Sequence, residues 1–186
     1  SGTDNVAVGY EALKANTTGG ANVAIGSNAL LLSTTASNNT AVGYKSLEAN
    51  TTGDNLVAVG RYALKDNTTG VNNVAIGVTA LEQNTTANNN TALGYAALTS
   101  NTTGTQNTAV GAYAMDVTTT GGYNSAFGVN ALGDNTTASY NTALGNAALN
   151  RNTTGSNNTA IGYAALQENT SADFNTAVGA TALDSC

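Results

Sequence analysis

The sequence contains no proline, tryptophan or histidine, a single cysteine, and only 9% charged residues among its 186 positions. Without histidine, the chain lacks the side chain that most often acts as a general acid or base. Cys186 alone cannot form an internal disulfide. The net charge of −6 argues against nucleic-acid binding, which needs clustered Lys and Arg. No apolar run reaches the ~18 residues of a transmembrane helix, so membrane insertion is not expected.

Asparagine and threonine are abundant instead, together about a third of the chain, and they recur with a fixed period. A glycine closes an Ala-aliphatic-Gly triplet every 17 residues, without insertion or deletion. The consensus unit reads N-T/V-A-V/I/L-G-Y-x-A-L-x-x-N-T-T-G/A-x-N. Residues 1–186 are therefore one repeat domain of eleven units and resemble an excerpt from a longer fibre. The eleven glycines are Gly9, Gly26, Gly43, Gly60, Gly77, Gly94, Gly111, Gly128, Gly145, Gly162 and Gly179.

A 17-residue unit suits one coil of a parallel β-solenoid or β-roll, and the fold class predicted is all-β. The segment N-T-A-V-G, as in Asn39 to Gly43, has the alternation of a short strand. The aliphatic residue and the Thr or Val two positions earlier share one strand face, which we expect to be buried. The Leu of the following Y-x-A-L segment should also point inward. A helical turn over Tyr10 to Ala15 is the alternative, although such a short helix is marginal without packing.

The opposite strand face carries alanine in all eleven units, whereas a solvent-exposed position would vary. Something must pack closely against it, either the coil's own tight corner or another chain. We favour another chain, which predicts a symmetric side-by-side bundle of rods. No cofactor is expected. The predicted subunit-packing face consists of Ala7, Ala24, Ala41, Ala58, Ala75, Ala92, Ala109, Ala126, Ala143, Ala160 and Ala177.

The segments N-V-A-I-G (Asn22 to Gly26 and Asn73 to Gly77), N-T-A-V-G (Asn39 to Gly43) and N-T-A-I-G (Asn158 to Gly162) resemble the N-S-V-A-I-G motif of trimeric autotransporter adhesin heads. The unit is also similar to N-T-A-V-G-Y-x-A-L arrays of bacteriophage tail fibres. The period here is longer than that of the adhesin heads, because N-T-T-x adds a longer turn. These resemblances imply a trimeric fibre, extracellular, on a cell surface or on a virion, that supports or mediates attachment to a host receptor or glycan.

Catalytic and metal sites are not expected. The eleven carboxylates are scattered over variable positions, such as Asp54 and Asp173 at the turn and Glu48 and Glu82 after the leucine. No converging pair of them repeats, so an enzyme is not predicted. The turns also lack the G-G-x-G-x-D repeat that binds calcium, which favours solvated turns over a metal site.

Two other surfaces carry alternative functions. Stacked threonines could form an ice-binding face, although adjacent Thr residues point to opposite sides and one row should bond to backbone. Tyr10, Tyr44, Tyr95 and Tyr163 could form a sugar-stacking patch, but partly buried packing is favoured. A passive spacer without a ligand is a third reading. The candidate ligand or ice face consists of Thr17, Thr51, Thr68, Thr85, Thr102, Thr119, Thr136 and Thr153.

Overall fold

A computed structural model describes residues 2–184 as an all-β chain built from three-residue strands. Each strand follows an asparagine, or in one coil Leu56, and ends just before a repeat glycine. The strands are one residue shorter at each end than the predicted N-T-A-V-G segment. They are β1 (Val6–Val8), β2 (Val23–Ile25), β3 (Thr40–Val42), β4 (Val57–Val59), β5 (Val74–Ile76), β6 (Thr91–Leu93), β7 (Thr108–Val110), β8 (Ser125–Phe127), β9 (Thr142–Leu144), β10 (Thr159–Ile161) and β11 (Thr176–Val178).

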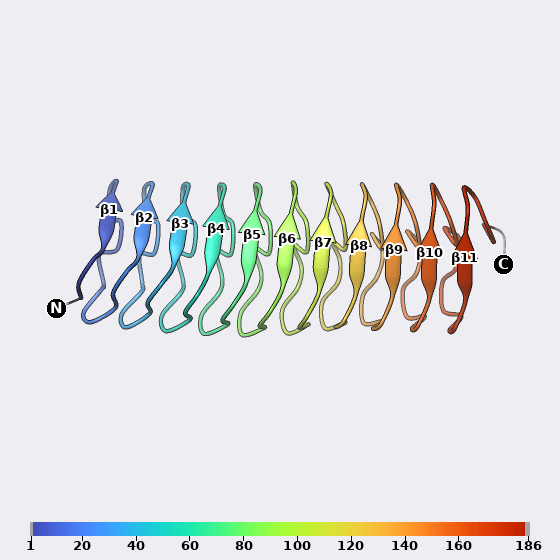
Figure 1. Cartoon of the computed structure of the whole chain (residues 1–186). Helices are drawn as coiled ribbons and strands as arrows, with labels where there is room; N and C mark the ends of the chain where they lie inside the picture. The colour runs from blue at the N-terminus through green and yellow to red at the C-terminus, as the bar shows by residue number, and fades with distance from the viewer. Residues whose placement is uncertain (1, 185–186) are drawn as a thin grey trace.

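The strands form one parallel sheet in sequence order from β1 to β11. Equivalent residues of successive units are paired, for example Ala24 with Ala41 and Val42 with Val59. Each unit is therefore one coil of a solenoid, and Figure 1 shows the coils stacked into a rod with the termini at opposite ends. The predicted parallel β-solenoid with a 17-residue coil is confirmed.

The segment between the glycine and the N-T-T run consists of consecutive turns, so the helical alternative is wrong. In the first coil Ala12 N–H donates to Gly9 O at 3.3 Å, and Asn16 N–H donates to Leu13 O at 3.3 Å. Leu13 N–H instead donates to Ala29 O of the next coil at 3.0 Å. Because every second amide bonds to a neighbouring coil, stacking rather than helical hydrogen bonding holds the segment. No helix long and apolar enough to cross a membrane occurs in residues 2–184.

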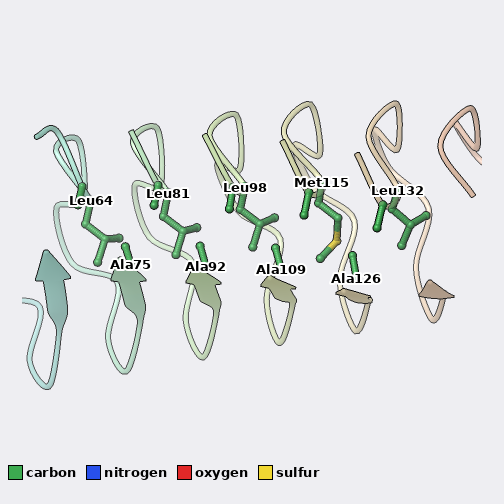
Figure 2. Packing of buried hydrophobic residues seen from close by; sticks show 14 of the residues in the cluster. Leu64, Ala75, Leu81, Ala92, Leu98, Ala109, Met115, Ala126 and Leu132 are labelled. Atoms are coloured by element: carbon green, nitrogen blue, oxygen red, sulfur yellow. The ribbon is translucent and has the colours of Figure 1, made fainter. Parts of the chain in front are cut away.

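The core is a row of leucines facing a row of alanines. Leu64, Leu81 and Leu98 are fully buried and point toward Ala75, Ala92 and Ala109 of the sheet (Figure 2). Met115 fills the leucine position in its coil and is buried as well. The prediction that the leucine side chains point inward is confirmed.

The predicted strand faces are reversed. The alanines from Ala24 to Ala160 are all 0% exposed within a single chain, so they cannot form a subunit-packing face. The coil is narrow, and a leucine from the opposite wall already occupies its interior, which leaves room for only a methyl group on the sheet. The coil's own interior, the alternative considered above, is what keeps this position small. At the two ends of the row, Ala7 in the first coil is exposed and Ala177 is 3% exposed. The residues wrongly predicted to form the subunit-packing face are Ala7, Ala24, Ala41, Ala58, Ala75, Ala92, Ala109, Ala126, Ala143, Ala160 and Ala177.

Two buried asparagine rows hold the coils in register. The asparagine before each strand accepts the backbone N–H of its counterpart one coil on, as Asn90 does from Asn107 at 2.9 Å. Its Nδ2 donates to a turn carbonyl of the following coil, as from Asn90 to Gly104 O at 2.9 Å. The asparagine of the N-T-T run bonds side chain to side chain, as Asn84 Nδ2 does to Asn67 Oδ1 at 2.8 Å. These amides satisfy buried backbone groups that an apolar residue would leave unpaired.

The repeat glycines allow this close stacking. Gly77 has φ +141°, a conformation that residues with a side chain rarely adopt. A Cβ placed there would also lie too close to the carbonyl oxygen of Gly94 in the next coil. Both effects explain why every unit retains glycine at this position.

Candidate functional surfaces

The outward face of the sheet carries one row of apolar residues and one row of Thr, Ser and Val residues over all eleven strands. The aliphatic residue of each strand lies on it, and many of these side chains are substantially exposed, as Leu93 (44%), Phe127 (41%) and Leu144 (48%) are. The Thr, Ser or Val two positions earlier completes a second row on the same face. Neither row contains a charged residue. We call these two rows the sheet face: residues 6, 23, 40, 57, 74, 91, 108, 125, 142, 159 and 176, and residues 8, 25, 42, 59, 76, 93, 110, 127, 144, 161 and 178.

The two threonine rows lie in different environments, and the row named from the sequence is the less exposed one. Its hydroxyls donate to the carbonyl of the equivalent threonine one coil on, for example from Thr51 to Thr68 O at 3.0 Å. The hydroxyl proton is therefore used within the chain, which leaves only the oxygen as an acceptor for a ligand or for ice. The same bond is made by Thr17, Thr51, Thr68, Thr85, Thr102, Thr119, Thr136 and Thr153.

The second threonine of each N-T-T run forms the outward row instead. The prediction that one row bonds to backbone and the other points outward is correct. The sequence analysis, however, chose the wrong row as the outward one. The period-2 alternation says that neighbours diverge, and only the coil path decides which of them faces solvent. The exposed threonines are Thr18, Thr35, Thr52, Thr69, Thr86, Thr103, Thr120, Thr137 and Thr154.

The predicted tyrosines lie on the surface beside the sheet and are more exposed than the packing interpretation implies. Tyr10 is 71% exposed, Tyr95 51% and Tyr163 62%. Two of these four tyrosines, Tyr44 and Tyr95, each pair with a tyrosine of the next coil that was not predicted to belong to the patch. Tyr44 and Tyr62 have ring centroids 5.6 Å apart, and Tyr95 and Tyr113 are 5.2 Å apart. Their positions differ by 18 residues, so a search at the repeat period alone misses the pairing.

The titratable groups do not converge on a cavity. No pocket and no group of three or more His, Cys, Asp or Glu residues in metal-binding proximity occurs in the part of the chain that the structure describes. Cys186 lies outside that part. Burial first, and the charge of Asp134 in addition, raise the pKa of Asp116 against the opposing effect of backbone hydrogen bonds.

Comparison of the chain with protein families, curated proteins and solved structures finds no match.

Proposed function

We propose that this chain is a segment of a structural fibre whose copies associate side by side as a homotrimer and which supports or mediates attachment at a cell or virion surface. The observation that carries the proposal is the sheet face, which is uncharged over all eleven coils and carries an unbroken row of apolar side chains, many of them substantially exposed. Soluble monomers rarely expose contiguous apolar surface on this scale. A covering partner removes it from water.

The dimensions of the sheet face suit packing against other rods. At ~4.8 Å per strand the face is ~50 Å long, and three residues at ~3.3 Å make it ~10 Å wide. Three such faces turned toward a common axis would bury on the order of 1,500 Å² in total, the size of a standard specific interface. The rows of all three rods repeat with the same spacing, so their side chains can interdigitate along the full length.

Light scattering tests the association. The expected mass is near three times 18.4 kDa. A triple variant with Val59→Lys, Ile76→Lys and Leu93→Lys places charges at the centre of the sheet face and should yield monomers. The matched control, Thr52→Lys, Thr69→Lys and Thr86→Lys, adds the same charge to the exposed threonine row and should keep the wild-type mass. A wild-type monomer at high concentration would contradict the proposal.

Ice binding by a single rod is the second candidate, and the unbroken exposed threonine row favours it. These hydroxyls repeat with the strand spacing along one side of the rod. Thermal hysteresis and ice shaping should then be present and should disappear in a Thr69→Tyr and Thr86→Tyr variant. Absence of both effects in the wild-type chain removes this candidate. Cell-binding assays separate an adhesive fibre from a passive spacer.

A further inference from the structure

Three of the five basic residues gather around one pair of tyrosines, on the coils that carry β3 and β4. Arg61 lies over the Tyr62 ring, with its Cζ 4.8 Å from the ring centroid. Lys65 Nζ is 5.6 Å from the same centroid, and Lys45 Nζ is 5.7 Å from that of Tyr44. The two rings are 5.6 Å apart and tilted by 55°. We call Tyr44, Tyr62 and Arg61 the tyrosine–arginine platform. Three basic side chains therefore lie against two aromatic rings, in a chain with net charge −6.

The lysines of the cluster have partners within the chain. Lys45 Nζ is 3.1 Å from Glu48, which raises the lysine pKa through a hydrogen bond and its charge. Lys65 Nζ is 3.3 Å from Asp66 and 3.8 Å from Glu82. Burial lowers the pKa of Lys65, but these carboxylates outweigh it and the net shift is upward. Both lysines are therefore neutralised locally.

Arg61 differs from the lysines in having no such partner. Between residues 2 and 184, no carboxylate forms an ion pair with its guanidinium. The side chain is exposed, and its Cζ lies over the Tyr62 ring. The guanidinium N–H groups have the fork geometry that matches a carboxylate. Beside them, Tyr44 is 44% exposed.

We propose that the tyrosine–arginine platform binds a carboxylate-bearing sugar, as found in acidic glycans. The guanidinium edge takes the carboxylate through two parallel hydrogen bonds, and the aromatic rings pack against the apolar face of the sugar ring. The other four basic residues, Lys14, Lys45, Lys65 and Arg151, form ion pairs within residues 2–184, so Arg61 is the basic side chain left open to an anion. The inference rests on the proposed role in attachment but not on the association of rods, since all three residues belong to one chain.

The chain contains a natural counterpart that lacks the cation. Tyr95 and Tyr113 form a ring pair of 5.2 Å at the same repeat positions three coils further on. Ala112 stands there in the place of Arg61, and Asp116 in the place of Lys65. The neighbouring Tyr95, burial and the charge of Asp116 raise the pKa of Tyr113. This second pair offers aromatic surface without a guanidinium for a carboxylate.

Titration with sialyllactose, followed by NMR or calorimetry, tests the site, with lactose as the neutral sugar and inorganic phosphate as the simple anion. The wild-type chain should bind sialyllactose, and Arg61→Ala should weaken binding about tenfold or more, as expected for the loss of charge-assisted hydrogen bonds. Lys14→Ala removes one positive charge from the Glu11 ion pair and should leave binding unchanged. Equal binding by wild-type chain and Arg61→Ala, or equal binding of lactose or phosphate, would overturn the proposal.

A transplant gives the complementary test. In the Arg61→Ala background, Ala112→Arg with Asp116→Lys should restore sialyllactose binding at the Tyr95–Tyr113 pair. Failure to restore it, in a variant with an unchanged circular dichroism spectrum, would overturn the assignment to two rings and a guanidinium. Light scattering on the same samples separates this inference from the fibre proposal. Trimers without sugar binding contradict the site alone, and monomers with sugar binding contradict the association alone.

Discussion

Asn101 and Thr118 occupy the same position in successive coils, and the change from amide to hydroxyl leaves Asn101 Oδ1 buried without a hydrogen-bond partner. Where the row continues, the asparagine one coil on donates its Nδ2 to this atom, as Asn84 does to Asn67 at 2.8 Å. The same defect recurs where Ser33 interrupts the row, and there Asn16 Oδ1 and Ser33 Oγ are unpaired.

Thr118→Asn should therefore stabilise the rod. The new Nδ2 would reach Asn101 Oδ1, and the new Oδ1 would replace the hydroxyl that now accepts from Asn135 Nδ2 at 3.2 Å. Satisfying one buried acceptor is worth about 1 kcal/mol. Thermal and urea unfolding measure the change.

The reverse substitution provides the control for Thr118→Asn. Asn152→Thr creates the same defect in a regular part of the row, where Asn152 now donates to Asn135 Oδ1, and should lower the melting temperature. A melting temperature that falls in Thr118→Asn, or stays constant in both variants, would contradict the importance of the row.

Leu56 interrupts the other asparagine row, and Leu56→Asn should not lower the melting temperature. The leucine is fully buried, but it has no oxygen to accept the Asn73 N–H, as other asparagines of the row do for their neighbours. An amide there regains this bond, which offsets the lost apolar burial. Leu64→Asn is the matched comparison, because Leu64 lies in the leucine row facing alanines, and it should cost about 3 kcal/mol or more. Equal losses in urea unfolding would refute the distinction.

Ala75 and Ile76 test which strand face is interior. Ala75→Leu adds bulk to a side chain that is 0% exposed and lies next to the leucine row, and overpacking of this kind costs about 1–3 kcal/mol. Ile76→Leu conserves volume on the outward face, where the isoleucine is 38% exposed, and should cost less than about 1 kcal/mol. A greater loss in Ile76→Leu than in Ala75→Leu, by thermal unfolding, would restore the face assignment derived from the sequence.

The period, the parallel strands and the inward leucines follow from the sequence, because every coil repeats the same constraint. Which of the two strand faces points into the core does not follow from the sequence. Periodicity places Ala75 and Ile76 on opposite faces, and general hydrophobicity assigns the larger one to the interior. In a narrow coil, the side chains of the opposite wall, here Leu64 and Leu81, determine how large a residue the sheet can hold inside. The pattern of a single strand contains no information on the width of the coil.

The candidate sites could likewise be predicted only in part from the sequence. The tyrosine positions were identified, but their partners belong to the adjacent position of the next coil, so the pairing of Tyr44 with Tyr62 depends on how coils stack. The threonine rows were recognised as divergent, yet the choice between Thr51 and Thr52 depends on the turn path. Both rows consist of threonine, so residue type cannot distinguish them.

The raised pKa of Asp116 predicts that the stability of the folded chain depends on pH. Burial raises its pKa, so the folded chain binds this proton more tightly than the unfolded chain, whose Asp pKa is ~3.9. Stability due to Asp116 is therefore fully present below the unfolded value and falls as pH rises through the folded value. Asp116→Asn removes the cost of the buried charge and should raise the melting temperature at pH 7 but not at pH 3. Asp4→Asn, at an exposed turn, makes the same change in net charge and is the control for that change. A gain for Asp116→Asn of equal size at pH 3 and pH 7, by thermal circular dichroism, would show that the carboxylate charge is not its cause.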